Sequence, residues 1–448
     1  VVKMPQDLQI IPLVSCSSED LTQSVDLCRR LRLLMGLNHK CLNRILSVKF
    51  VQDMAVCEIE KKHSVSLQDI IDEAALTICP ISKLLIYSVF LDLLGLATYL
   101  FTITDDPDVF AMLTDCLSAS LIAVDDYGYS SVSLIQGLRC LPALSSNRIE
   151  TRTVYGRLLL DKLASILQSM FLAHASATKE RDLVRRYLSK KSTSFSPTGE
   201  ELILDFAFRP SKYTLVKSDS QDQVLYRNPR IVEVQAAIDY FRGLKRDVCG
   251  ETPLMQTISE GGCSDASRNT LCVDYSTTRF VARNGHTALF IAVLKNCAPA
   301  VEKLRIYEAR MRLASSVTIC GHLLSHITAL HLAVSLHRHE IIELLAPYEA
   351  MLQDTLMHFT PLHIAAFTGD LHAIRLLSPY AAGIPDKNGW TALVWCAYLD
   401  NKCSLCELLS LEGTEKTLRL ALHAATSVKS TVCSTFLNTI FAHLSMPT

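Results

Sequence analysis

A short phrase, Thr followed by Pro or Ala and then by Leu, recurs five times in the second half of the chain. Its threonines are Thr252, Thr287, Thr328, Thr360 and Thr391, so successive copies begin 35, 41, 32 and 31 residues apart. A phrase that returns at a period of about 20–50 residues indicates stacked supersecondary units that bury their apolar faces against one another. The second half is therefore expected to be a repeat array and not a single globular core.

The copy that begins at Thr360 shows what each unit is built from. Thr360 suits the residue before a first helix, Pro361 suits its first turn, and Ala365 and Ala366 allow a second helix to approach closely. The run Thr-Pro-Leu-His-Ile-Ala-Ala over residues 360–366 resembles the ankyrin-repeat consensus.

This resemblance implies an all-α ankyrin solenoid over residues 232–448, with the apolar run at 418–437 as its terminal cap. His331 and His363, which follow their threonines by three residues, are expected to be hydrogen-bonding core histidines. The 41-residue gap and the insert at 261–281 are expected to hold longer loops or irregular helices.

Ankyrin stacks bind proteins through their hairpin tips and first helices, so a protein partner is expected at the repeats. Aromatic side chains are enriched at the energetic centres of such interfaces. The candidate protein-binding residues are Ile364, Phe367, Trp390, Trp395 and Tyr398. The alternative is that these side chains only pack between adjacent repeats.

Several short motifs follow one another in order through residues 1–215. Val1-Val-Lys3-Met4 is similar to a V-A-I-K strand, and residues 31–39 are similar to the end of the helix that follows such a strand. Residues 55–60 are similar to a hinge strand. Further along the chain, residues 124–128 are similar to a D-F-G turn and residues 206–211 to a D-P-x-x-R-P-S phrase. Together they resemble NIMA-related (NEK-like) protein kinases. The resemblance implies an N-terminally truncated α+β kinase-like domain with a mostly helical large lobe. It also implies vestigial cofactor-binding roles for Lys3 and Asp126, and a buried structural role for Arg209.

The residues that catalysis would need depart from this family. On the same alignment Arg30 stands where a glutamate should hold Lys3, Ile103 stands at the catalytic base, and Asp108 stands at the metal-binding asparagine. Thr153 replaces the aspartate that anchors the catalytic loop. Because phosphoryl transfer needs metal, lysine and base in position together, a pseudokinase is expected. It has no catalytic residue, no metal site and no cofactor, although Mg-ATP binding is left open.

The amino-acid composition limits the classes of partner and the cellular environment that are expected. Lys and Arg number 44 against 45 Asp and Glu, and this balance gives no basic excess for nucleic acid. The apolar run at 84–104 is long enough to span a bilayer, but Asp92 at its centre is costly in lipid, so a buried core helix is expected and not membrane insertion. The 16 cysteines, scattered through a long apolar chain, favour reduced thiols and a cytoplasmic protein. Metal or redox use is left open for Cys403 and Cys406.

A degenerate kinase-like domain at 1–215, a linker at 216–231 and ankyrin repeats at 232–448 together resemble the expanded kinase–ankyrin family of diplomonad protists. The resemblance implies a non-catalytic scaffold that binds protein partners, and an association with the cytoskeleton would be compatible with it. Two alternatives stay open. One is an active serine/threonine kinase that binds Mg-ATP through Lys3 and Asp126, and the other is a drifting or truncated copy without selected function.

Overall fold

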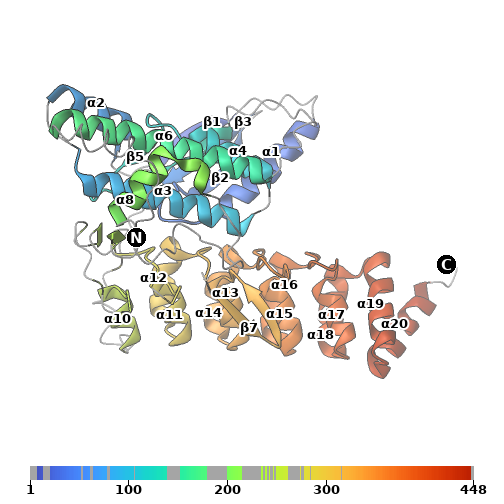
Figure 1. Cartoon of the computed structure of the whole chain (residues 1–448). Coiled ribbons are helices and arrows are strands. Elements are labelled where there is room, and N and C mark those ends of the chain that lie inside the picture. Colours follow the sequence, from blue (N-terminus) through green and yellow to red (C-terminus); the bar gives the residue numbers. More distant parts are fainter. Residues whose placement is uncertain are drawn as a thin grey trace. The chain divides into compact units, whose positions relative to one another are not determined.

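The computed structural model divides the chain into two compact units, Val1–Lys245 and Arg246–Thr448, and each is described by itself (Figure 1). The structure describes residues 8–13, 21–51, 54–60, 64–77, 81–104, 106–138, 152–178, 199–213, 234–235, 238–239, 242, 246, 249–260, 273, 277–282, 284–313 and 315–444.

The N-terminal unit begins with a three-stranded antiparallel sheet. Its strands β1 (Leu8–Leu13), β2 (Ile45–Val51) and β3 (Met54–Glu60) lie in the order β1-β3-β2, and α1 (Leu21–Met35) connects β1 to β2. In the central strand Cys57 and Ile59 are buried, whereas Glu58 between them is half-buried and pairs with Lys49 at 3.0 Å. This alternation is that of a sheet with one face on the core.

The rest of this unit is a small second sheet surrounded by helices. The sheet has the order β4 (Val65–Ser66), β5 (Ile122–Val124) and β6 (Ser130–Val132). The helices are α2 (Leu67–Thr77), α3 (Lys83–Ile103), α4 (Pro107–Cys116), α5 (Leu134–Leu138), α6 (Arg152–Thr178) and α8 (Gly199–Phe208), followed by the 3-10 turn η1 (Pro210–Lys212). Because α3 is apolar on nearly all sides, it lies at the centre and packs against α6.

Asp92 in the middle of α3 is neutralised inside the protein. Its carboxylate accepts hydrogen bonds from Arg242 Nη2 at 2.6 Å and from the backbone N–H of Ser130 at 2.8 Å. The guanidinium of Arg242 also stacks on the ring of Tyr129, 3.7 Å from its centroid. A buried charge is tolerated when it is paired and hydrogen-bonded in this way.

Among the described residues, two helices are long and apolar enough to cross a membrane by length and composition alone. They are α3 and the segment Val154–Ala175 of α6, and 67% and 61% of their apolar windows are buried in the structure. The core helix of a globular unit has the same length and composition.

The division between the units falls later than expected. Residues 232–244 were expected to open the repeat array, yet Ile238 is fully buried in the N-terminal core and Arg242 pairs with Asp92. The compact division lies between Lys245 and Arg246. The expected linker, 216–231, lies outside the described residues.

The C-terminal unit is a row of helix pairs, visible from yellow to red in Figure 1. After α10 (Pro253–Ser259) the pairs are α11 (Ala288–Leu294) with α12 (Ala298–Glu308), α13 (Ala329–Ser335) with α14 (His339–Glu349), α15 (Pro361–Thr368) with α16 (Leu371–Ala381), α17 (Ala392–Tyr398) with α18 (Lys402–Glu412), and α19 (Glu415–Ser427) with α20 (Thr431–Leu444). Each repeat threonine is the residue immediately before a first helix. The phrase therefore marks where each repeat begins.

The 41-residue gap holds a β-hairpin, so the expectation of a long loop or irregular helix was wrong there. Strands β7 (Ser316–Ile319) and β8 (His322–Ser325) are antiparallel and joined by Cys320 and Gly321. Both turn residues have positive φ, 51° and 80°. Two such residues form the tight turn that matches strand twist. Apart from this hairpin, the elements that the structure describes in the C-terminal unit are helices, as expected for an all-α solenoid.

The phrase histidines link neighbouring repeats, as expected. Nδ1 of His331 accepts from the backbone N–H of Thr328 at 3.2 Å, and Nε2 donates to the carbonyl oxygen of Phe359 at 3.0 Å. His331 is fully buried, and His363 makes the same arrangement one repeat later.

Three buried glutamates, which the sequence analysis missed, hold the repeats together further. Glu308, Glu349 and Glu412 each follow a repeat threonine by 21 residues, and each carboxylate accepts two backbone N–H groups. Glu349, for example, binds Leu330 in its own repeat at 2.8 Å and Arg310 after the preceding repeat at 2.7 Å. These contacts satisfy donors that would otherwise be buried unpaired.

The cysteines differ in part from the expectation of reduced thiols. Among the described residues ten are free, including the exposed Cys403 and Cys406. Cys297, at the start of α12, is disulfide-bonded. The expectation is therefore wrong at this position.

Candidate functional site

Six ring-bearing side chains gather on the repeats around Trp395, and we name them the aromatic face. They are His322, Phe359, Phe367, Trp390, Trp395 and Tyr398. The ring centroid of Trp395 in α17 lies 4.8 Å from that of Phe367 in α15, 4.9 Å from that of Trp390 and 5.6 Å from that of Tyr398. Edge-to-face contacts at these separations are favourable for aromatic pairs.

The β7–β8 hairpin contributes to the same cluster. The imidazole of His322 stacks on Phe367 with centroids 5.0 Å apart and meets Trp395 edge-on at 5.8 Å. Phe359, which precedes α15, packs beneath them 5.0 Å from Phe367. The aromatic face therefore extends over two successive repeats and the inserted hairpin.

Asp386 holds the indole of Trp395 and the backbone of Trp390 in place. The indole Nε1 of Trp395 donates to Asp386 Oδ2 at 3.0 Å. The other oxygen, Oδ1, accepts from the backbone N–H groups of Asn388 and Trp390 at 2.8 and 2.9 Å. Because Asp386 is itself buried, these bonds form in a poorly hydrated environment where each is strong.

The exposure of each candidate residue decides what it can touch. Phe367, Trp390 and Tyr398 are half-buried, so each presents part of its ring to solvent. Trp395 is only 9% exposed and supports its neighbours from within. Ile364 is fully buried between helices, so the expectation that it contacts a partner was wrong.

Sequence reasoning missed three members of this arrangement. His322 was not among the candidates, because the hairpin that brings it to Phe367 was not foreseen. Phe359 lies immediately before Thr360 and Asp386 five residues before Thr391, and neither was among the candidates. Their spacing from Thr360 and Thr391 is the signal that could have found them.

The residues expected from the kinase resemblance do not form a complete nucleotide-binding site among the described residues. Lys3 lies outside the described residues. Asp126 is exposed in the turn between β5 and β6, and it is Asp125 whose carboxylate accepts from the backbone N–H groups of Tyr127 and Tyr129, at 3.0 and 2.8 Å. Arg209, expected to be buried, is half-buried and lies 3.6 Å from Asp205.

The stretch aligned with the catalytic loop is helical at both ends. Ile103 is the last residue of α3, and α4 begins at Pro107. Asp106 caps α4 by accepting from the N–H of Asp108 at 3.0 Å. The carboxylate of Asp108 pairs with the buried Arg30 at 3.3 Å.

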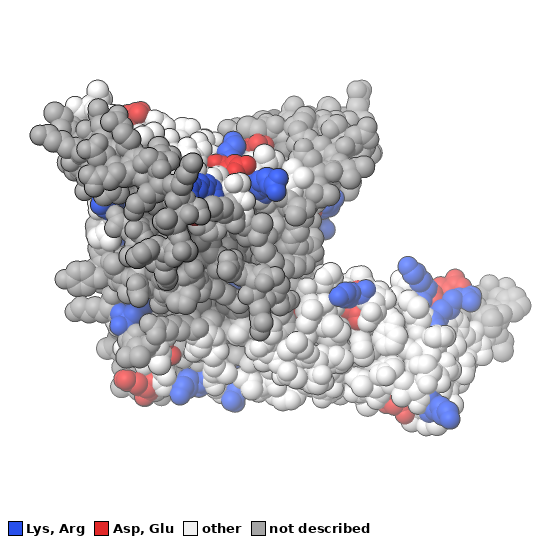
Figure 2. Space-filling view, in the orientation of Figure 1, with Lys and Arg blue, Asp and Glu red and all other residues white. Residues whose placement is uncertain are grey.

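The described surface of the repeats is sparsely charged on the side seen in Figure 2. Lysine, arginine, aspartate and glutamate are scattered there without forming a patch of one sign. A surface of this kind suits apolar and polar contacts with another protein more than contacts with a phosphate backbone.

Comparison with known families identifies the repeats at residues 311–419. A family model of ankyrin repeats, spanning three copies, matches residues 311–384 and 330–419. The C-terminal region contains ankyrin repeats. The matched span includes all six residues of the aromatic face, and such repeats are protein–protein interaction modules. No curated protein matches the chain.

Proposed function

We propose that the protein is a non-catalytic scaffold whose repeats bind a protein partner through the aromatic face. The observation that carries this proposal is the position of Trp390 and Tyr398. Both rings are partly exposed, their centroids lie 5.6 Å apart, and both contact the buried Trp395. Tryptophan and tyrosine dominate the energetic centres of protein interfaces.

The rigidity of the aromatic face supports the same proposal. Asp386 holds the loop before α17, and Trp395 holds Trp390 and Tyr398 from beneath. Rings that are already fixed lose little conformational entropy on binding, so more of the contact energy appears as affinity. The partner expected here is a protein segment with apolar or aromatic side chains.

The proposal is tested by comparing three forms of the full chain in affinity capture with quantitative mass spectrometry. A specific partner is retained by the wild type and lost by Trp390→Ala combined with Tyr398→Ala. Tyr380→Ala is the matched control, because Tyr380 is an exposed tyrosine of α16 outside the aromatic face. Equal capture by the double variant and the wild type would contradict the proposal.

The N-terminal unit acts in this proposal as a pseudokinase module. Three features support it. Ile103, which is aligned with the catalytic base, is the last residue of a helix, and Arg30, which is aligned with the glutamate that should hold Lys3, pairs with Asp108. The strand order β1-β3-β2, with α1 after β1, suits the implied small lobe. A titration of the full chain with Mg-ATP tests it, because a ligand that binds the folded state raises its stability. We expect no shift in the unfolding midpoint, and a shift that depends on Mg²⁺ would favour the active-kinase alternative.

A further inference from the structure

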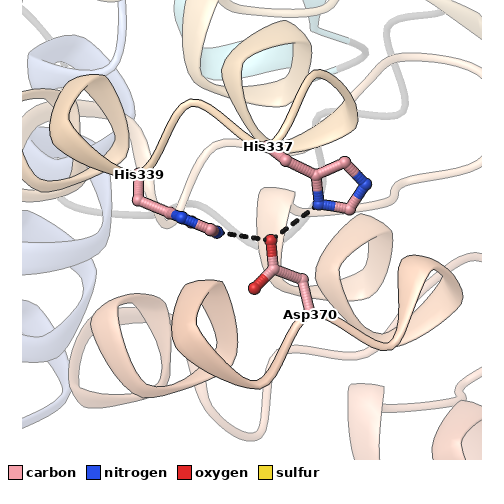
Figure 3. Close-up of side chains that lie close together, drawn as sticks. All are labelled: His337, His339 and Asp370. Carbon is pink, nitrogen blue, oxygen red and sulfur yellow. Dashed lines mark hydrogen bonds and ion pairs between the residues drawn. The ribbon is translucent and has the colours of Figure 1, made fainter.

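Two histidines from one repeat converge on an aspartate of the next. Nδ1 of His337 lies 2.8 Å from Asp370 Oδ2, and Nε2 of His339 lies 2.7 Å from the same oxygen (Figure 3). The three ligand-type atoms lie within 4.8 Å of one another. In the part of the chain that the structure describes, this is the group of histidine, cysteine and acidic side chains spaced to hold a metal ion.

We propose that His337, His339 and Asp370 form a binding site for a divalent transition-metal ion, of which zinc is the expected physiological example. Two imidazole nitrogens and one carboxylate oxygen are ligands that zinc accepts, whereas magnesium and calcium prefer oxygen alone. Three protein ligands leave a fourth position of the tetrahedron for water or a partner's side chain.

The carboxylate is held in place for this role by the start of α16. Asp370 is the residue before that helix, and its Oδ1 accepts from the backbone N–H groups of His372 and Ala373, both at 3.1 Å. The remaining oxygen therefore faces the two histidines. Outer contacts that orient a ligand in this way are typical of metal sites.

The three side chains differ in their exposure to solvent. The side chain of Asp370 is only 7% exposed, whereas those of His337 and His339 are 52% and 40% exposed. An ion can reach the imidazoles from solvent while the anionic ligand stays partly shielded.

The distances require only a small adjustment. Ligand atoms around a tetrahedral zinc ion lie roughly 3.3 Å apart, given bonds of about 2.0–2.1 Å. The present nitrogen–oxygen separations of 2.7 and 2.8 Å are shorter, because hydrogen bonds and not an ion join these atoms. Rotation of the exposed imidazoles opens the gap without moving the repeat backbone, which is fixed by bonds such as Arg338 N–H to Ala333 at 3.0 Å.

The backbone conformation at His337 allows a substitution that removes this ligand without disturbing the fold. His337 has a φ of 54°, in the left-handed region that favours glycine, and Gly369 occupies the equivalent position of the next repeat with a φ of 68°. His337→Gly therefore removes a ligand while relieving backbone strain. It is expected to fold at least as well as the wild type.

The test is isothermal titration of the metal-free full chain, with the disulfide of Cys297 intact, with zinc chloride, and with magnesium and calcium chloride as further probes. The wild type is expected to bind one zinc ion more per chain than His337→Gly, and His339→Asn should lose the same ion. Asp370→Asn keeps a capping oxygen but loses the charge, so it should bind that ion at least about tenfold more weakly. Because the free cysteines are the same in all variants, any zinc that they bind does not change the difference in the number of zinc ions bound per chain.

His423→Ala is the matched control, since His423 is an exposed histidine of α19. It should bind zinc as the wild type does. Identical zinc stoichiometry and affinity in the wild type and in His337→Gly would overturn the proposal, as would equal binding of magnesium. Because the ligands come from the α13–α14 and α15–α16 repeats, a bound ion should also raise the wild type's unfolding temperature and leave that of His337→Gly unchanged.

Discussion

The Nε2 atom of His363 donates a hydrogen bond to the carbonyl oxygen of Trp390, 3.1 Å away. The histidine that begins one repeat is thereby tied to the residue that precedes the next repeat's threonine. His331 makes the equivalent bond to Phe359. These buried imidazoles join successive units through the backbone, and they make the stability of the array depend on pH.

Acid should weaken the repeats between pH 6.5 and pH 4. Burial lowers the pKa of His331 from 6.5 to about 4, and burial also lowers that of His363. The unfolded chain therefore takes up protons in this range before the folded chain does, so stability falls as the pH falls. Protonation of His331 alone should lower the free energy of unfolding by about 3 kcal/mol. This loss begins below pH 6.5 and is nearly complete at pH 4.

Urea unfolding at a series of pH values measures this effect. Both tryptophans of the chain, Trp390 and Trp395, lie in the aromatic face, so intrinsic fluorescence reports on the repeats alone. His331→Gln, which does not titrate, should show a smaller slope over the same range. A wild-type stability that is constant from pH 6.5 to pH 4 would contradict the assignment.

Asp386→Ala should disorder the aromatic face without unfolding the array. It removes the acceptor of the Trp395 indole and of the Trp390 N–H. The loss of these bonds should cost about 1–3 kcal/mol and shift tryptophan emission towards that of solvated indole. Asp386→Asn keeps acceptor oxygen at the site and should have the smaller effect, which the same fluorescence measurement resolves.

Glu349→Ala should destabilise the repeats by about 3 kcal/mol, because it leaves the buried N–H groups of Arg310 and Leu330 without their acceptor. Glu349→Gln should cost less, since an amide oxygen still accepts. The control is Glu415→Ala, an exposed glutamate of α19, for which a change within about 0.5 kcal/mol is expected. Equal unfolding midpoints in urea for Glu349→Ala and the control would refute the tethering role.

In the N-terminal unit, Asp92→Ala should cost about 3–5 kcal/mol because it leaves the guanidinium of Arg242 buried without its carboxylate. Joint replacement by Asp92→Leu and Arg242→Met should recover much of that loss. Far-ultraviolet circular dichroism measures the change, and tryptophan fluorescence should keep its wild-type transition because both tryptophans lie in the other unit. If the double variant were no more stable than Asp92→Ala, the ion pair would not be the cause.

The parts of the fold that follow from local sequence were predictable. Thr328 and Thr360 mark the first helices because a capping threonine acts on its own neighbours. Helix α3 was predicted from the long apolar run at 84–104. Glu349 was missed because a buried glutamate has the same sequence signal as a surface one, and only the neighbouring repeat makes it an acceptor.

The candidate sites depended on contacts between repeats. Phe367, Trp390, Trp395 and Tyr398 were found because they are aromatic residues in or next to the phrase of their repeat. The hairpin that delivers His322 has no counterpart in the phrase, so nothing in the sequence placed it. His337 and Asp370 are 33 residues apart, close to one repeat period, and stacking turns that spacing into contact.

One repeat differs from its neighbours in a way that should govern how the array opens. Glu308, Glu349 and Glu412 tie their repeats to the preceding loops, but α16 ends in Ala381 at the equivalent position. In an array held by nearest-neighbour contacts, the unit with the weakest coupling exchanges its amide hydrogens first. We therefore expect local opening to start at α15–α16. Because Phe367 of the aromatic face lies in α15, partner binding and the mobility of this unit should be coupled.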